Sequence, residues 1–184
     1  MGLVGNGLER AVQQAFTRPI PKSAGAQMRY LVRQLKGTRA VAQQLGVSQR
    51  TVERYVKDQI RRPRPDLAQR LADAVRERWQ PRVRAQARRQ AATSTGVVVD
   101  VRARFGFTAA PGSTDDARLR HLTIALPPRH AARLFDAQEA GASEQQLRDI
   151  AGQALGEMYF QDGGRRAQGL HIEFTDIEQM EFDL

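Results

Sequence analysis

The segment TRAVAQQLGVSQRTVERYVK at residues 38–57 has the pattern of a helix-turn-helix. Gly46 permits a sharp turn between two short helices, Thr38 can cap the first helix, and Ser48 can cap the second. Apolar side chains return both helices to one core, at Val41, Ala42, Leu45, Val47, Val52, Tyr55 and Val56. Short helix pairs with a glycine corner also occur in purely structural bundles, but the corner, both caps and the basic flank agree on a DNA-binding motif.

The second helix of this motif turns polar side chains outward. Donors and acceptors of this kind fit base edges and phosphates when a recognition helix lies in the major groove. A proline-rich arm follows at residues 59–65, where three arginines suit a phosphate track or a minor groove; the alternative is a solvated turn between helices. The predicted DNA-binding residues are Ser48, Gln49, Arg50, Thr51, Glu53, Arg54, Lys57, Arg61, Arg62 and Arg64.

The charge of the chain indicates a polyanionic partner. The sequence has 29 Lys and Arg against 20 Asp and Glu, a net charge of +9 and a pI near 11.0. Residues 1–95 carry 20 basic and 6 acidic side chains, whereas residues 96–184 carry 9 and 14, so two modules with different partners are expected. The absence of cysteine excludes disulfides, a thiol nucleophile and cysteine-ligated zinc. No apolar run approaches about 20 residues and the N-terminus lacks an apolar signal core, so we expect a cytoplasmic protein without membrane contact.

Helical periodicity surrounds the motif. The apolar stripes are Leu8, Val12 and Phe16; Met28, Leu31, Val32 and Leu35; and Leu67, Leu71, Val75 and Trp79. Asp66 can cap the last of these helices, and an arginine run over residues 76–89 is expected to add affinity for the DNA backbone. We therefore expect a helical DNA-binding domain over residues 1–90 and a linker over residues 91–96.

The hydrophobic period changes in the second half of the chain. Alternating apolar residues predict strands over residues 97–105, 122–126 and 170–174. Helical spacing predicts one helix over residues 129–140 and another that is capped by Ser143. The simplest assembly is an α+β domain over residues 97–184, in which two helices cover a small antiparallel sheet.

The connection between the first two strands, residues 106–117, is longer than a tight hairpin needs. Its Ala-Ala-Pro-Gly sequence resists regular structure, so the hydroxyls of Ser113 and Thr114 should be exposed beside the carboxylates of Asp115 and Asp116. The alternative interpretation is a disordered tip capped by Asp115. Metal-spaced histidines, glycine-rich phosphate loops and nucleophile elbows are missing from the sequence. We therefore expect neither a self-sufficient enzyme nor a metal site.

The whole chain closely resembles the telomere terminal proteins of linear bacterial replicons, the Tpg family. The resemblance lies in the opening Met1-Gly2-Leu3-Val4, the helix-turn-helix, Arg61-Arg62-Pro63, and the loop Pro111-Gly112-Ser113-Thr114-Asp115-Asp116. It implies a protein primer, in which the hydroxyl of Thr114 becomes esterified to a deoxynucleotide and ends attached to the 5′ end of DNA. Ser113 and residues 93–95 stay open as alternative acceptors, and Asp115 and Asp116 either help to hold the metal of a polymerase or begin the next strand.

The resemblance also implies partners. These are telomeric DNA with its 3′ single-stranded overhang, a telomere-associated protein that recruits the chain, and a DNA polymerase, all met at chromosome ends in the nucleoid. Mg²⁺ is expected from the polymerase, where it can lower the pKa of the hydroxyl and stabilise the phosphoryl transition state, so no permanently bound cofactor is expected. The alternatives are a transcription regulator whose α+β domain dimerises or binds a ligand, and a DNA-processing enzyme.

Overall fold

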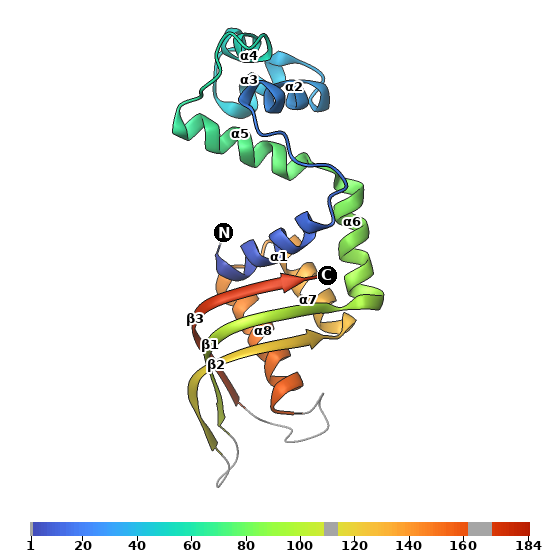
Figure 1. Cartoon of the computed structure of the whole chain (residues 1–184), viewed down its shortest axis with the longest axis vertical. Helices are drawn as coiled ribbons and strands as arrows, with labels where there is room; N and C mark the ends of the chain where they lie inside the picture. Colours follow the sequence, from blue (N-terminus) through green and yellow to red (C-terminus); the bar gives the residue numbers. More distant parts are fainter. Residues whose placement is uncertain (1, 109–113, 162–170) are drawn as a thin grey trace. The chain divides into compact units, whose positions relative to one another are not determined.

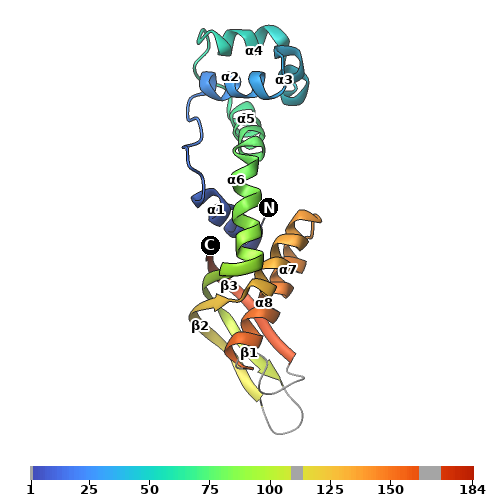
Figure 2. The same cartoon turned by 90° about the vertical axis from the view of Figure 1, so that its right-hand side faces the viewer.

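The computed structural model of the chain describes residues 2–108, 114–161 and 171–184, with the backbone alone at Thr114, Asp115 and His171. The chain forms two compact units, one of residues 17–81 and one in which residues 1–16 join residues 82–184. We call them the helical unit and the α+β unit (Figure 1, Figure 2). In the sequence, the helical unit is an insertion into the α+β unit. The predicted fold class is confirmed: a helical helix-turn-helix region is followed by an antiparallel sheet with helices.

Four helices build the helical unit: α2 (Ala24–Gln34), α3 (Thr38–Leu45), α4 (Gln49–Val56) and α5 (Pro65–Arg78). Their apolar stripes meet in one core, whose most deeply buried side chains are Met28, Leu31, Val41, Leu45, Val52, Leu71 and Val75. The ring centroids of Tyr30 and Trp79 lie 4.8 Å apart, and the Trp79 indole donates to the carbonyl of Arg18. The last residues of the unit are thereby held against its first ones.

The corner of the helix-turn-helix is built as predicted. Gly46 has a φ of 62°, in the left-handed region that glycine adopts without strain, and the amide of Val47 donates to the carbonyl of Ala42 at 3.0 Å. Ser48 then caps α4, where its hydroxyl accepts the amide of Thr51 at 3.1 Å.

Two helix starts differ from the predicted ones. Gly37 is the N-cap of α3, and Thr38 is the first helical residue, whose hydroxyl instead accepts the side-chain amide of Gln49 at 3.1 Å. Helix α5 starts with Pro65, because the fixed φ of proline suits the first helical position, so Asp66 lies inside the first turn.

The sheet of the α+β unit has three antiparallel strands in the order β2-β1-β3: β1 (Val97–Thr108), β2 (Thr114–Leu126) and β3 (His171–Asp183). Two helices, α7 (Pro128–Glu139) and α8 (Glu144–Tyr159), cover one face (Figure 1, Figure 2). Strand β1 alternates as predicted, and its buried side chains are Val97, Val99, Val101, Ala103 and Phe105. Its other side chains face away from the helices, on a surface that we call the open face of the sheet.

Helix α1 (Leu3–Gln14) corrects the predicted boundary of the DNA-binding domain at residues 1–90. It packs against β3 and α8, and its Val4, Leu8 and Val12 side chains are fully buried in the core of the α+β unit. Gly7 brings the helix so close to the sheet that an added Cβ would lie 2.8 Å from the ring of Phe182. The apolar stripe of α1 is thus completed by the sheet, far along the sequence, rather than by the neighbouring helices.

The predicted linker at residues 91–96 is also corrected. Helix α6 (Pro81–Gln90) continues into a π-helical turn, Ala91–Thr95, and Ala91 is fully buried in the core of the α+β unit. Gly96, with a φ of 73°, then turns the chain into β1.

The predicted long connection at residues 106–117 is shorter than expected. Strands β1 and β2 pair through Phe107 with Asp115 and Thr108 with Thr114, so the connection is residues 109–113, which lie outside the described residues. Phe107 packs edge-on against Phe160, with ring centroids 4.9 Å apart, and this contact extends β1 past its regular alternation.

Candidate nucleic-acid interface

Helix α4 presents one polar and one apolar face. Its Val52 and Tyr55 side chains are buried, whereas Gln49, Arg50 and Arg54 are exposed. Lys57, the C-cap, is also exposed, and Thr51 and Glu53 are half-buried. The predicted recognition residues therefore share one surface of a short, well-capped helix, as docking in a major groove requires.

Hydrogen bonds hold the beginning of this surface. The Gln49 amide donates to the Thr38 hydroxyl and to the Glu53 carboxylate, each at 3.1 Å. The hydroxyls of Ser48 and Thr51 lie 2.8 Å apart. Ser48, Gln49, Thr51 and Glu53 are all predicted to contact DNA. In the structure they also form hydrogen bonds with one another, and Gln49 forms one with Thr38 of α3.

Arginine and lysine side chains dominate the rest of the surface. Within the described residues, Arg50, Arg54 and Lys57 form no ion pair. Together with Glu53 and Gln59 they line a surface hollow of about 560 Å³. Guanidinium groups offer paired donors to a guanine edge or a phosphate, so this hollow carries the chemistry for nucleic acid.

The end of α4 is fixed against α2. Asp58 has a φ of 55°, and its carboxylate lies 2.7 Å from the Arg29 guanidinium, which also donates to the Val56 carbonyl at 2.9 Å. Gly25 leaves room for this turn, since an added Cβ there would lie 2.0 Å from the Asp58 carboxylate. The pair orients the chain as it leaves the recognition helix.

The arm at residues 60–64 is extended, and the side chains of Arg61, Arg62 and Arg64 are exposed. No ion pair involves them among the residues that the structure describes. Burial raises the pKa of Tyr55, while the charges of Arg54 and Arg64 oppose that rise. The charge of Arg64 in the arm therefore acts on a side chain of α4.

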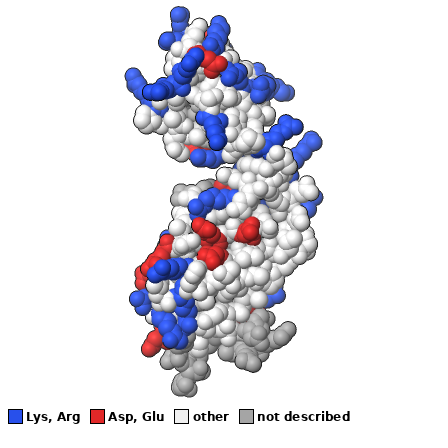
Figure 3. All heavy atoms as spheres, viewed as in Figure 1, with Lys and Arg blue, Asp and Glu red and all other residues white. Residues whose placement is uncertain are grey.

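The helical unit, as the structure delimits it, has a strongly positive net charge. Residues 17–81 carry 15 basic and 5 acidic side chains, and the α+β unit carries the remaining 14 and 15. Figure 3 shows Lys and Arg spread over the helical unit with few carboxylates between them. The attraction for a polyanion therefore belongs to the unit that contains the helix-turn-helix.

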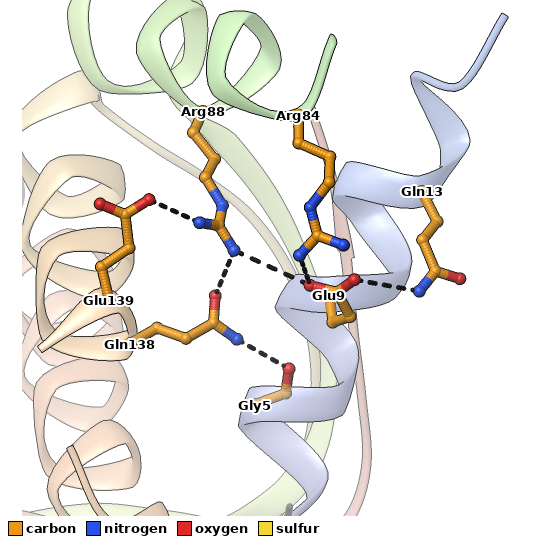
Figure 4. A network of polar contacts seen from close by, with 7 residues as sticks. All are labelled: Gly5, Glu9, Gln13, Arg84, Arg88, Gln138 and Glu139. Carbon is orange, nitrogen blue, oxygen red and sulfur yellow. Dashed lines mark hydrogen bonds and ion pairs between the residues drawn. The ribbon is translucent and has the colours of Figure 1, made fainter. Parts of the chain in front are cut away.

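Two arginines of the basic run at residues 76–89, which is predicted to contact DNA, form ion pairs within the α+β unit. Arg84 and Arg88 reach Glu9 of α1 at 2.7 and 3.8 Å, and these three side chains are only 16–18% exposed (Figure 4). Arg88 also pairs with Glu139 of α7, and Gln138 donates to the Gly5 carbonyl at 3.0 Å. This network, which we call the α1 clamp, joins α1, α6 and α7. The prediction that Arg84 and Arg88 add affinity for DNA is therefore corrected: their guanidinium groups pair with carboxylates of the α+β unit.

The predicted acceptor residues lie in the α+β unit, separate from the recognition residues. Thr114 and Asp115 are the first two residues of β2, with side chains outside the described part of the chain. Asp116 is exposed, and Ser113 lies outside the described residues. The structure thus places the backbone of Thr114 at the end of the β1–β2 hairpin.

The structure also brings together three polar residues that the sequence did not single out. On the open face, the Asp100 carboxylate accepts the Thr123 hydroxyl at 2.7 Å and lies 3.0 Å from the His121 ring. The Thr123 hydrogen bond and then the His121 contact lower the pKa of Asp100. Alternation along β1 places Asp100 on this face, but its neighbours follow only from the register with β2. No cluster of three metal-ligating side chains occurs within the described ranges.

The arm gives a prediction about salt. Arg61→Ala/Arg62→Ala/Arg64→Ala should weaken DNA binding and make the slope of log K against log salt concentration shallower by up to about 3, because each lost phosphate contact removes about 0.9. Equilibrium binding measured at several salt concentrations checks this. Arg70→Ala is the matched control, since Arg70 is an exposed arginine of α5 that pairs with Asp66. An unchanged slope in the triple variant would remove the arm from the interface.

Comparison with known proteins agrees with this interface. A family model described as Helix-turn-helix matches residues 28–78, from within α2 to the end of α5. No curated protein and no solved structure matches the chain. Across the described residues, no helix has both the length and the apolar character to span a membrane. The chain therefore contains a helix-turn-helix domain of the DNA-binding type over residues 28–78.

Proposed function

We propose that this chain is a protein primer of the telomere terminal protein class: its helical unit binds DNA, and its α+β unit offers the Thr114 hydroxyl to a DNA polymerase. The observation that carries the proposal is the position of Thr114, which begins β2 directly after the 109–113 connection, in a chain whose other unit binds DNA. In Figure 1 this hairpin end lies at the opposite end of the α+β unit from α6. Thr114 pairs with Thr108, the last residue of β1, at the end of the three-stranded sheet, and a hydroxyl at the end of a sheet meets the steric demand of entering a polymerase cleft better than one in its middle.

The proposed reaction is nucleotidyl transfer to a side-chain hydroxyl. The Thr114 oxygen attacks the α-phosphorus of a deoxynucleoside triphosphate; an O–P bond forms, the bond to pyrophosphate breaks, and the hydroxyl proton passes to a base or water in the polymerase site. Mg²⁺ held by the polymerase stabilises the charge on the phosphoryl oxygens. The chain itself supplies the nucleophile and its position. Asp115 and Asp116 are proposed to support this step beside the metal.

Several competing hydroxyls are used in local structure, which supports the choice of Thr114. Ser48 and Ser143 accept backbone amides as N-caps, at 3.1 and 3.3 Å. Thr93 and Ser94 donate to carbonyls one turn earlier, at 2.8 and 3.0 Å. Ser113 stays the alternative acceptor.

The proposed partners follow from the two units. The positive helical unit would hold telomeric DNA near its 3′ single-stranded overhang. The α+β unit carries one more acidic than basic side chain, and we place the contact with a telomere-associated protein and the polymerase there. Such a protein would work in the cytoplasm, at the chromosome ends of the nucleoid.

Covalent labelling tests the proposal. The chain is incubated with telomeric template, polymerase, telomere-associated protein, Mg²⁺ and an α-³²P-labelled deoxynucleotide, and label that survives denaturation is measured. We expect labelled protein. An unlabelled chain under conditions that label an authentic terminal protein would contradict the proposal, and tight binding to a palindromic site without any adduct would favour a transcription regulator.

A further inference from the structure

Two irregularities of the sheet flank Arg104 of β1. The pairing of β1 with β2 shifts between Phe105 and Phe107, so that two residues of β2, Asp116 and Ala117, stand opposite one residue of β1. The pairing of β1 with β3 shifts between Arg102 and Arg104, where three residues of β3 stand opposite one. Bulges opposite Gly106 on one side of the central strand and opposite Ala103 on the other allow the sheet to bend in this region. Figure 1 shows all three strands changing direction between their two halves.

The Arg104 guanidinium connects the two bulges. Its Nε lies 3.2 Å from the carboxylate of Asp176 in the β3 bulge, and a terminal nitrogen donates to the carbonyl of Ala117 in the β2 bulge at 2.9 Å. Asp176 has a φ of 48°, a conformation that aspartate tolerates better than most residues. One side chain of the central strand therefore holds both outer strands.

The energetic value of this bridge to folding is small, because both partners are well exposed: the Arg104 side chain is 49% exposed and the Asp176 side chain 72%. Its effect is geometric. A planar guanidinium that reaches a carboxylate on one side and a carbonyl on the other permits one arrangement of the two bulges. Arg120 adds a second contact, from its Nε to the Phe105 carbonyl at 2.9 Å.

Beyond this bend lies the end of the β1–β2 hairpin. It consists of the last residues of β1 after Phe105 and the first residues of β2 from Thr114. The direction in which this end points depends on the angle that the bulges adopt. We propose that Arg104 is a positioning residue, which fixes the bend of the sheet and thereby aims the hairpin that carries Thr114. The inference rests on the proposed priming function, which it extends to a residue outside the hairpin tip.

The matched pair of variants is Arg104→Met and Arg102→Met. Arg102 lies on the same strand and the same face, is 54% exposed, and pairs with Glu178 of the same β3 bulge at 2.8 Å. Among the described residues it forms no hydrogen bond or ion pair with the β2 bulge. A difference between the two variants therefore reports the bridge between bulges and not the loss of one exposed ion pair.

Two readouts separate positioning from stability. In the labelling reaction, Arg104→Met should lower the maximal rate about 10-fold or more at an unchanged KM for the nucleotide and unchanged DNA affinity, because misplacing a reacting group slows the chemical step. Arg102→Met should label like the wild type, and Arg104→Lys, which can reach one acceptor of the two, should recover part of the rate. In hydrogen exchange, Arg104→Met should expose the amides of residues 114–118 more than Arg102→Met does.

The outcomes distinguish this inference from the proposed function. If the wild type is labelled and Arg104→Met is labelled at the same maximal rate, the positioning role is overturned while the priming function stands. If the wild type is not labelled, the priming function fails; equal exchange in the two variants would then also overturn the fixed bend. Asp176→Gly keeps a residue suited to positive φ and removes the carboxylate alone, so it should give an intermediate loss of rate. A wild-type rate in that variant would contradict the bridge even if Arg104→Met folds poorly.

Discussion

Thr114→Ala is expected to abolish covalent nucleotide labelling of the chain. The substitution removes the oxygen that would form the ester bond, and no other group at that position can replace it, so the expected loss is complete rather than partial. The backbone at Thr114 pairs with Thr108 in the sheet, and alanine keeps this pairing. DNA affinity should stay within about 2-fold of wild type, because the recognition residues lie in the other unit, which has its own core.

Matched hydroxyl variants sharpen this experiment. Thr123→Ala removes another threonine of β2, which is exposed and whose hydroxyl donates to Asp100, and should leave labelling unchanged. Ser113→Ala tests the neighbouring acceptor. Labelling that survives in Thr114→Ala but disappears in Ser113→Ala would move the acceptor by one residue, and labelling that survives in both would remove it from the hairpin. Alkali should release the label, since phosphoesters of serine and threonine can eliminate.

Deleting residues 1–16 is expected to unfold the α+β unit. Val4, Leu8 and Val12 are fully buried in its core, and truncating even one such leucine to alanine costs about 2–5 kcal/mol. Losing the whole helix, with three such side chains, costs an amount comparable with the total stability of about 5–15 kcal/mol that a domain possesses. The deletion also removes Glu9, which leaves Arg84 and Arg88 without their shared carboxylate in a largely buried place.

The reverse deletion provides the control. Replacing residues 17–81 by a short Gly-Ser linker should leave the α+β unit folded, because the insertion begins and ends at one place: the Thr17 amide donates to the Gln80 side chain at 3.0 Å. Circular dichroism and thermal unfolding of both proteins check the pair. The helical unit can still unfold cooperatively when residues 1–16 are deleted, so the decisive signal is that of the sheet: wild-type protection of the β1 and β3 amides in hydrogen exchange would contradict the assignment of α1 to the α+β unit.

Local chemistry explains what the sequence could predict. The corner at Gly46 and the cap at Ser48 depend on residues within a few positions of each other, and both are confirmed. The alternation of buried and exposed side chains along β1 is a property of one strand, so it could be predicted from the sequence, and it indicated a sheet. The recognition helix could be predicted from the same short-range pattern, because the polar residues between its apolar positions must face outward.

Distant partners explain what the sequence could not predict. The apolar stripe of α1 is compatible with any core, and nothing near it shows that β3 and α8 receive it. In the sequence, Arg84 and Arg88 belong to a basic run of the kind that binds phosphates. Only the structure shows that Glu9 and Glu139, which are distant in the sequence, pair with them. The extent of the β1–β2 hairpin depends on register and on the contact of Phe107 with Phe160, neither of which is local in the sequence.

Mass spectrometry of the primed protein tests the central claim most directly. Trypsin cuts after Arg104 and Arg118, so residues 105–118 form one peptide, FGFTAAPGSTDDAR, with Ser113 and Thr114 near its middle. We predict that, after the priming reaction, this peptide gains the mass of one deoxynucleoside monophosphate and that fragmentation assigns it to Thr114. A nucleotide found on any other peptide, or an unmodified peptide from protein that carries the label, would contradict the account.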